Sequence, residues 1–555
     1  MRRSRLALCL FPAFLGLFFL STPSGIAQSH TCPVTPAKDQ TDAEKAFLKA
    51  DYETAVKLYQ AQLQTKPNDP ELTAQLSQVL LRQQKVKEAD TLVQEALVSS
   101  PKSVILQTAL GEIQYREGTP WLAGDTATAA MKMDPCYAPL RLLLAKILEL
   151  NSYYSAAAKE VKIAHMLDPH NAQIRLQWLH TLPLQQRIVE LESYLAAGSG
   201  DDAETVTDLR FYLEFLKRQL TEPHKSCRLV SDQESVTVPF AQIMYDPNHI
   251  RAFGLEVKLN GHSARLQIDT GASGLIISRS VAERAGLKQF SRTEIGGIGS
   301  QGRKSGYTAY VDEIKIGSLE FRDCAVEVID RGNVVDLDGL IGADVFSDFL
   351  VTLDYPTRKL HLNPLPKRPD QPAPSKPSLE TAGNGSTGST GTDSTDKTQG
   401  SSAGPRDRYI APEMKDWAHL YRIGHNLLLP ASLNGSKPKM FIIDTGSSST
   451  SISPEVAREV TKVHIDSDTT VQGISGKVDK VFKADRITFK FAHISQQVED
   501  VVSFSTDSIS KSLDMNTSGL IGITALGYLK IDIDYRDGLM NFQYDPEHGF
   551  NIYNR

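Results

Sequence analysis

Two copies of one pattern decide the fold of this chain: LQIDTGAS at residues 266–273 and FIIDTGSS at residues 441–448. Each copy is an apolar strand that runs into an aspartate, a threonine and a glycine. A carboxylate at the end of a buried strand is costly unless it is hydrogen-bonded and used in chemistry. Asp269 and Asp444 are therefore the candidate catalytic pair, and we expect the rest of the fold to bring them together.

The sequence around the two copies is repeated as well. A Leu-Asn-Gly sequence precedes each copy, at 259–261 and 433–435, and Asn-Gly suits the type I′ turn of a β-hairpin. A Gly-Leu-Ile-Gly sequence follows each copy, at 339–342 and 519–522, and after it come an apolar strand and an Asp-Tyr pair. Four features in the same order at similar spacing indicate an internal duplication.

This order of hairpin, Asp-Thr-Gly, glycine-bearing hairpin and Gly-Leu-Ile-Gly resembles the retropepsin-type and pepsin-like aspartic proteases. The resemblance covers roughly the C-terminal 55% of the chain. It implies two all-β retropepsin-like lobes that form a bilobed aspartic protease, with one aspartate from each lobe. The chain departs from many retroviral enzymes after the second glycine, where it carries Ala343-Asp344 and Ile523-Thr524 in place of the usual Arg and Asp or Asn.

The chemistry implied by this resemblance needs two carboxylates at close range, and neither a metal nor a cofactor. Like charges a few ångströms apart cannot both ionise, so the pair holds one proton. The ionised member takes a proton from a water, and the protonated member donates to the peptide carbonyl. We expect Thr270 and Thr445 to hydrogen-bond across the two loops. We expect Gly271 and Gly446 to allow close approach and to donate N–H groups to the carboxylates.

A glycine-rich stretch in each copy is the candidate flap over the site. Residues 296–302 read GGIGSQG and contain a G-x-G-x-x-G pattern, but no apolar helix follows, which disfavours a dinucleotide site. In a protease lobe this position corresponds to the flap hairpin, and residues 473–476 are its counterpart; an ordinary hairpin is the alternative. The candidate flap and substrate glycines are Gly297, Gly299, Gly473 and Gly476. Tyr307 or Tyr310 is a candidate to touch substrate.

A second repeat occupies the N-terminal part of the chain. Prolines recur every 34 residues, at Pro67, Pro101, Pro135 and Pro169. An alanine stands twelve positions before each of them, at Ala55, Ala89, Ala123 and Ala157. Small residues let two helices approach closely, and proline ends each repeat. The pattern resembles tetratricopeptide (TPR) repeats and implies an all-α TPR-type solenoid over residues 40–222, capped by residues 180–222. Its role is either capture of a protein or peptide on a concave face, or a rigid spacer or cap for the protease.

The first residues are typical of a secretory signal peptide, which we assign to residues 1–27. Three arginines precede an apolar run at residues 6–20, and Gly25-Ile26-Ala27 is a small-residue cleavage site. A membrane anchor is the alternative, but the apolar run is short for a span. We therefore expect an exported protein, periplasmic or secreted, with no stable membrane span after cleavage. Export permits disulfides, yet the spacing of the remaining four cysteines leaves open whether they pair: Cys32, Cys136, Cys227 and Cys324.

The remaining boundaries follow from composition. We expect a first protease lobe at residues 223–365, a disordered linker rich in Pro, Gly, Ser and Thr at 366–408, and a second lobe at 409–555. As a flexible chain the linker would span roughly 35–40 Å, enough for the two lobes to pair within one chain. Pairing between two chains is the alternative.

Other function classes find little support. The net charge is −6 and no basic patch indicates a nucleic-acid partner. The chain contains no H-E-x-x-H, G-x-S-x-G or Walker sequence. His419 and His425 lie on one segment, and we interpret them as structural. Asp354 and Asp534 are interpreted as turn or surface acids that stabilise the last strands of each lobe.

The sequence therefore predicts an exported aspartic endopeptidase that hydrolyses peptide bonds, with a TPR module for protein or substrate capture. One alternative is a non-catalytic envelope scaffold that only binds peptide. Another is a protease that is active only when lobes from two chains pair.

Overall fold

A computed structural model describes residues 32–544 except 199, 225, 233, 247–248, 330–337 and 370–405. The predicted signal peptide, most of the predicted linker and the last residues of the predicted second lobe lie outside the described residues. Val34–Arg555 form one compact unit. Within the described part of the chain, no helix has both the length and the apolar character needed to cross a membrane.

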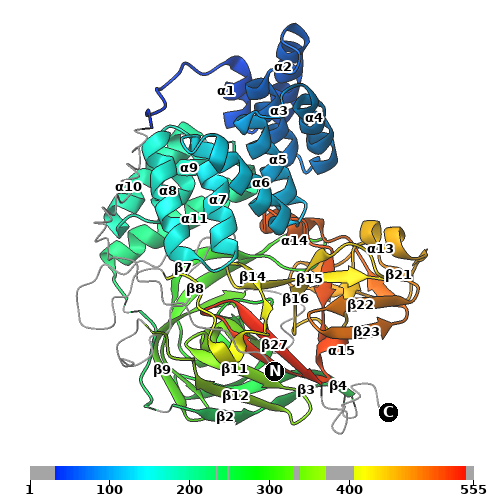
Figure 1. Cartoon of the computed structure of the whole chain (residues 1–555). Helices are drawn as coiled ribbons and strands as arrows, with labels where there is room; N and C mark the ends of the chain where they lie inside the picture. The colour runs from blue at the N-terminus through cyan, green and yellow to red at the C-terminus, as the bar shows by residue number, and fades with distance from the viewer. Residues whose placement is uncertain are drawn as a thin grey trace, which may run out of the picture. The chain divides into compact units, whose positions relative to one another are not determined.

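The N-terminal part is helical, and consecutive helices pack as antiparallel pairs (Figure 1). The helices are α1 (Asp42–Leu48), α2 (Tyr52–Thr65), α3 (Pro70–Arg82), α4 (Val86–Ser99), α5 (Val104–Arg116), α6 (Pro120–Met133), α7 (Ala138–Leu150), α8 (Tyr154–Leu167), α9 (Ala172–Leu179), α10 (Leu184–Ala197) and α11 (Ala203–Thr221). Helices α2, α4, α6 and α8 each end two residues before a proline of the 34-residue repeat. The repeated alanines are buried where paired helices meet, as expected of small residues at close helix contacts.

The first β-lobe is built on one mixed sheet with strand order β1-β9-β6-β10-β5-β4-β8-β7, and β3 pairs with β4. Its elements are β1 (Arg228–Leu229), β3 (Ala241–Asp246), β4 (His249–Leu259), β5 (His262–Asp269), β6 (Leu275–Ser278), α12 (Arg279–Arg284), β7 (Gln289–Ile295), β8 (Lys304–Ile316), β9 (Leu319–Ile329), β10 (Gly339–Gly342) and η2 (Ala343–Phe346). Strand β5 leads into the first Asp-Thr-Gly sequence, and β10 runs parallel beside it.

The second lobe repeats this plan with strand order β18-β21-β24-β17-β25-β16-β15-β22-β23, and β14 pairs with β15. Its elements are η3 (Pro412–Met414), β14 (Tyr421–Ile423), β15 (Asn426–Leu433), β16 (Lys439–Ile443), β17 (Ser451–Ile452), α13 (Pro454–Val460), β18 (Val463–Ile465), β19 (Gln472–Gly473), β20 (Gly476–Lys477), β21 (Phe482–Ala484), β22 (Ile487–Phe491), β23 (Ile494–Val498), β24 (Val501–Ser503), α14 (Asp507–Ser512), β25 (Gly519–Ile521) and α15 (Ile523–Leu526). Strand β16 leads into the second Asp-Thr-Gly sequence, and β25 runs parallel beside it. The predicted fold class, an all-α solenoid followed by two all-β lobes, is confirmed.

A third sheet joins the two lobes, with strand order β13-β27-β26-β11-β12-β2. Its strands are β2 (Val236–Pro239), β11 (Phe349–Asp354), β12 (Lys359–Pro364), β13 (Ala418–His419), β26 (Leu529–Asp534) and β27 (Leu539–Tyr544). The central pair is β11 of the first lobe against β26 of the second, side by side in Figure 1. Across this pair the Thr352 hydroxyl donates to the Asp532 carboxylate at 2.7 Å. The lobes of one chain therefore pair with each other in this structure.

Asp354 and Asp534, the last residues of β11 and β26, differ from the prediction that they are turn or surface acids. Asp354 and Asp534 do accept turn N–H groups, from Thr357 at 2.9 Å and Asp537 at 3.0 Å. They are not surface acids, because Asp534 is 0% exposed and Asp354 is 9% exposed. Burial raises the pKa of Asp534 to about 6, with a further contribution from the charge of Asp537. The surface interpretation was wrong because each strand end is covered in the sheet that joins the lobes.

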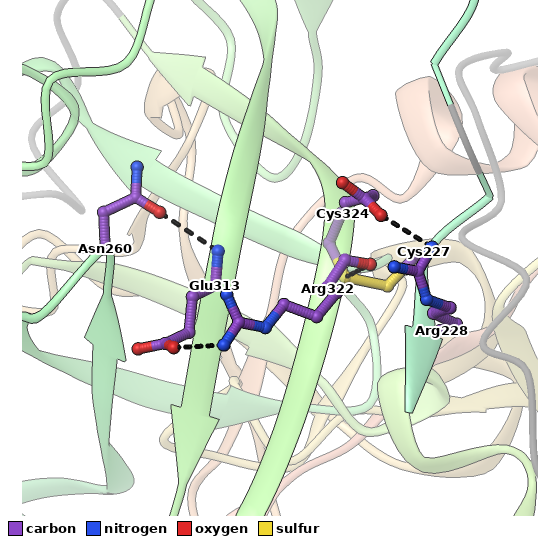
Figure 2. The surroundings of a disulfide bond; sticks show 7 residues. Cys227, Arg228, Asn260, Glu313, Arg322 and Cys324 are labelled. Atoms are coloured by element: carbon purple, nitrogen blue, oxygen red, sulfur yellow. Dashed lines mark hydrogen bonds and ion pairs between the residues drawn. A yellow bond between two sulfur atoms is a disulfide. The ribbon is translucent and has the colours of Figure 1, made fainter. Parts of the chain in front are cut away.

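A disulfide ties the start of the first lobe to strand β9 of its sheet. Cys227 precedes β1 and bonds to Cys324 of β9, 97 residues further along the chain (Figure 2). The neighbouring Arg228 forms an ion pair with Asp323 at 2.7 Å. Cys227 and Cys324 are both buried in the core of the lobe. The sequence left the pairing of the four cysteines open: Cys227 and Cys324 are bonded to each other, and Cys32 and Cys136 are disulfide-bonded as well.

The helical module packs on both lobes. Tyr115, Ala123 and Leu143 share one apolar cluster with Met440 and Leu520 of the second lobe. Helix α11 lies against β7 of the first lobe, where the ring of Phe215 meets that of Phe290 at a centroid distance of 5.7 Å. The module is therefore docked on the lobes and not tethered away from them.

Candidate active site

The two Asp-Thr-Gly loops meet where the lobes pair. Strand β5 ends at Asp269, and β16 ends one residue before Asp444. Both strands are buried and carry apolar residues up to the acid: Ile268 is 3% exposed and Ile443 is 0% exposed. A parallel neighbour holds each strand end, with Ile341 opposite Ile268 and Ile521 opposite Ile443. The repeated Gly-Leu-Ile-Gly sequences therefore support the loops from beside them.

The carboxylates of Asp269 and Asp444 are within hydrogen-bond distance of each other. Each faces the glycine of the opposite loop. A Cβ atom on Gly446 would lie 2.3 Å from Cγ of Asp269, and one on Gly271 would lie 3.2 Å from Cγ of Asp444. Only glycine leaves room for the opposing carboxylate at position 446, so this residue is required for the close approach of the pair.

Backbone N–H groups of the loops stabilise both carboxylates. Gly271 N–H donates to Asp269 Oδ1 at 2.7 Å. Asp444 Oδ1 accepts from Gly446 at 2.9 Å and from Ser447 at 3.0 Å. These bonds favour the ionised form of each acid.

The two threonines bind the loops to each other. Thr270 N–H donates to the hydroxyl of Thr445 at 3.0 Å, and Thr445 N–H donates to the hydroxyl of Thr270 at 3.0 Å. The Thr270 hydroxyl donates in turn to the carbonyl of Ile443 at 2.7 Å. Both threonines are buried, so these bonds are shielded from water and hold the aspartates in place.

Burial and proximity set the protonation of the pair. Burial raises the pKa of Asp269 well above its usual range, and the charge of Asp444 raises it further. Burial also raises the pKa of Asp444, opposed by its hydrogen bonds to Asp269, Ser447 and Gly446. The two acids therefore hold a shared proton to higher pH than an isolated aspartate would, and the pKa of Asp269 is raised more than that of Asp444.

Residues beyond the Asp-Thr-Gly sequences also hold the loops, although their own sequence predicts no role for them in the site. Asp344 accepts from the Ser273 hydroxyl at 3.0 Å and from Gly274 N–H at 3.0 Å. At the matching place in the second lobe, the Thr524 hydroxyl accepts from Thr450 N–H at 2.8 Å. Each residue stands two positions after a Gly-Leu-Ile-Gly sequence, and this repeated spacing is the signal that could have located both.

The two glycine-rich hairpin tips contact each other. Ser475 N–H donates to the carbonyl of Ile298 at 3.0 Å, and Gln301 N–H donates to the carbonyl of Ser475 at 2.8 Å. Ile474 packs on an apolar cluster of the first lobe, whereas Ile298 packs on the cluster that contains Leu520 of the second lobe. Each tip therefore crosses to the opposite lobe.

The predicted flap glycines lie where the tips cross. A Cβ atom on Gly299 would lie 2.3 Å from the carbonyl carbon of Ser475, and one on Gly473 would lie 2.4 Å from the carbonyl oxygen of Ile298. Gly297 faces Ile474 and Gly476 faces Gln301 in the same way. These four glycines permit contact between the two tips.

The flap tyrosines do not lie as expected. The Tyr310 ring stacks on His224 at a centroid distance of 3.7 Å, and its hydroxyl donates to Gln219 of α11 at 3.2 Å. Tyr307 is buried in the core of the first lobe. Both side chains are used in packing, and contact of either tyrosine with substrate stays a prediction.

Helix α11 also holds the base of the first hairpin by charge. The Arg303 guanidinium lies 2.5 Å from the carboxylate of Asp208 and donates to the carbonyl of Glu294 at 2.6 Å. The side chains of Arg303 and Asp208 are 14% and 11% exposed. The described residues contain no group of three or more His, Cys, Asp or Glu that could hold a metal ion.

Comparison with known families agrees with this geometry. The model of the aspartyl protease family matches residues 255–345 and 429–525, one segment in each lobe. Both lobes have the aspartyl protease fold. The model of the tetratricopeptide repeat matches residues 46–113 within the helical module. The predicted resemblance to aspartic proteases with N-terminal TPR repeats is thereby confirmed.

Curated relatives match only part of the chain. DNA damage-inducible protein 1 of Neurospora crassa is 25% identical over 203 residues, which are 33% of this chain and 45% of that protein. The protein of the same name from Cryptococcus neoformans var. neoformans is 31% identical over 111 residues, 20% of this chain and 25% of that protein. The UBA domain-containing protein Mud1 of Schizosaccharomyces pombe is 27% identical over 124 residues, 21% of this chain and 36% of that protein.

The chain thus spans less than half the length of these curated relatives. Among solved structures, a thermophilic TPR protein of Thermus thermophilus is 20% identical, with a TM-score of 0.26. The match covers 32% of this chain and 95% of that one.

Proposed function

We propose that this protein is an exported aspartic endopeptidase whose catalytic residues are Asp269 and Asp444 of one chain. The observation that carries the proposal is the buried pair of carboxylates between two loops that are bonded through their threonines. A merely structural site would have no need for two adjacent buried carboxyl groups, which are costly to hold together. The intact pair favours hydrolysis over a scaffold that only binds peptide.

The two aspartates have different roles in the proposed reaction. Asp444 is the ionised member and takes a proton from a water as the water oxygen bonds to the peptide carbonyl carbon. Asp269 gives its proton to the carbonyl oxygen, so a neutral gem-diol forms. Asp444 then returns its proton to the leaving nitrogen, Asp269 takes one back from a hydroxyl, and the C–N bond breaks.

Export is supported by the oxidised cysteines. Cys227 and Cys324 are bonded, and disulfides persist mainly in oxidising compartments. Together with the signal-like sequence at residues 1–27 this supports a periplasmic or secreted location. Nothing in the proposed reaction requires a metal, a cofactor or a nucleic acid.

The helical module acts in this proposal as a permanent support of the protease. Its apolar cluster with Met440 and Leu520, and the contact of α11 with the first hairpin, support this role. Capture of a protein on the concave face is compatible with it, because a docked solenoid can still present its other faces.

The test is cleavage of a peptide library by the mature protein from pH 3 to 8, with wild type, Asp269→Asn, Asp444→Asn and an equal mixture of the two variants. We expect each variant to lose at least about 10³-fold in kcat/KM, because neither acid can replace the other. We also expect mixing to restore nothing. Activity restored by mixing would mean that lobes pair between chains, and folded wild-type protein that cleaves nothing would contradict the proposal.

A further inference from the structure

The carbonyl of each catalytic-loop glycine is bonded to a side chain of the opposite lobe. Gln267 of the first lobe donates from Nε2 to the carbonyl of Gly446 at 2.9 Å. His425 of the second lobe places its Nε2 3.2 Å from the carbonyl of Gly271. A carbonyl oxygen only accepts hydrogen bonds, so the imidazole must carry a hydrogen on Nε2 at this contact.

The same two peptide groups also touch the catalytic carboxylates. In the peptide group between Gly446 and Ser447, the carbonyl accepts from Gln267, and the Ser447 N–H donates to Asp444 Oδ1 at 3.0 Å. In the peptide group between Gly271 and Ala272, the Ala272 N–H donates to the main-chain carbonyl of Asp269 at 3.4 Å and also lowers the pKa of the Asp269 carboxyl, as the weakest of the contacts that act on it. A donor on a peptide carbonyl strengthens the donation from the N–H of that peptide, because bonds in a chain polarise one another. Each catalytic acid is thus linked through one peptide to a side chain from the other lobe.

The two donors do not come from equivalent places in the duplication. Gln267 stands two residues before Asp269, where the second copy has Ile442. His425 stands in the turn between β14 and β15, outside both Asp-Thr-Gly sequences. The threonines and glycines of the loops are therefore symmetric, whereas the groups behind them are an amide on one side and an imidazole on the other.

The surroundings of His425 favour its neutral imidazole over the charged form. Burial lowers the pKa of His425, and the charge of Arg422 lowers it further. The carboxylate of Asp344 and the bond to Gly271 act in the opposite direction. The neutral ring retains one N–H, and the contact with Gly271 places that hydrogen on Nε2.

We propose that His425 and Gln267 are positioning residues of the protease, each donating across the lobes to the loop that carries the other lobe's aspartate. This inference rests on the proposed function and names the groups that make the two aspartates unequal. Because His425 supports the donor to Asp269, its loss destabilises the ionised form of Asp269 and delays ionisation to higher pH. Gln267 acts in the same way on Asp444.

The test compares His425→Leu with His425→Gln, in which the amide nitrogen can reach the position of Nε2. We expect His425→Leu to lower kcat about 10-fold with little change in KM, because the loop loses its position and substrate contacts remain. We expect the alkaline limb of the pH profile of kcat to move to higher pH by about half a unit. His425→Gln should restore kcat to within about 3-fold of wild type. It should also return the alkaline limb to its wild-type pH. Gln267→Leu should move the acid limb upward instead.

The matched control is His419→Leu, which replaces an exposed histidine of the same segment that lies in the sheet joining the lobes. It should leave kcat and both limbs unchanged. A readout that needs no substrate is the pH at which the melting temperature falls as Asp269 ionises. The pH of that midpoint should be higher in His425→Leu than in wild type, and it should return to the wild-type value in His425→Gln.

An unchanged midpoint in folded His425→Leu would overturn the inference whether or not the protein cleaves peptide. Loss of melting temperature by the same amount at every pH, with no recovery in the glutamine variant, would mean that His425 has only a packing role.

Discussion

At the scale of single residues, the site is a buried pair of acids held by backbone N–H groups. Asp444 is 8% exposed and receives two such bonds from its own loop. The pKa of Asp269 is raised well above its usual range by burial and by Asp444. A raised carboxyl pKa means that the folded state binds a proton that the unfolded state releases. Between the two pKa values, stability therefore falls as pH rises.

Replacement of Asp269 by Asn should remove this dependence, because the neutral amide needs no proton. We expect Asp269→Asn to have a higher melting temperature than wild type at pH 7, by a few degrees. The difference should shrink toward pH 3, because the aspartates of the unfolded chain then bind protons as well. Thermal unfolding followed by circular dichroism across this range measures both. The control Asp125→Asn, on the exposed face of α6, should show no such trend, and a lower melting temperature of Asp269→Asn at pH 7 would contradict the expectation.

At the scale of elements, the first hairpin is joined to the helical module and not only to its own lobe. Residues 289–295 of β7 pair with residues 304–309 of β8, and α11 lies against β7. Three ion pairs cross this contact with different burial, since Arg303 pairs with Asp208 and, at 4.0 Å, with Glu204, and Arg292 pairs with Glu214. Arg303 and Asp208 are nearly enclosed, whereas Arg292 and Glu214 are 66% and 41% exposed. The enclosed pair is the one expected to matter, because exposed pairs contribute little.

We expect Asp208→Asn to loosen the hairpin, since Arg303 would lose the charge of its buried partner. A loss of about 1–2 kcal/mol corresponds to a roughly 5–30-fold faster amide exchange where opening is local. Hydrogen exchange of the amides of residues 304–309 measures this change in the stability of the hairpin. Glu214→Gln removes a charge between the same two elements and is the control, with an expected effect under about 0.5 kcal/mol. Equal exchange in both variants would mean that the Asp208 contact does not hold the hairpin.

At the scale of the whole molecule, long-range contacts join parts of the chain that are far apart in sequence. The sheet that joins the lobes places β11 beside β26. The cluster of Tyr115, Ala123 and Met440 joins the solenoid to the second lobe. The disulfide between Cys227 and Cys324 closes a segment of 97 residues in the first lobe. A cross-link of this length restricts the unfolded chain more than the folded one.

The double variant Cys227→Ser, Cys324→Ser should lose about 2–4 kcal/mol of unfolding free energy, because the unfolded chain regains the entropy of an open loop. Both cysteines are replaced so that neither is left as a free thiol. Urea unfolding of the mature protein, followed by fluorescence, measures the change. A variant as stable as wild type would show that the bond adds nothing to the packing of Cys227 and Cys324 in the core.

Local periodicity was enough to predict the elements and the loops that carry the acids. The 34-residue spacing predicts paired helices because small residues and prolines must recur where helices meet and end. An apolar strand before Asp-Thr-Gly predicts a buried acid wherever it occurs, so Asp269 and Asp444 could be found without knowing their distance. The threonine and glycine roles followed from the same short sequences, as their hydrogen bonds show.

Only the tertiary structure decided which distant side chains meet at the site. Gln267 and His425 reach loops of the other lobe, 179 and 154 residues away, and Asp208 reaches Arg303 over 95 residues. No local pattern marks such residues, because their partners are set by how whole sheets and helices pack. The same reason explains why Tyr310 packs on α11 and why Asp534 is buried. Short-range spacing determines secondary structure and loop chemistry, whereas the contacts that distinguish the two aspartates depend on the packing of two unequal lobes.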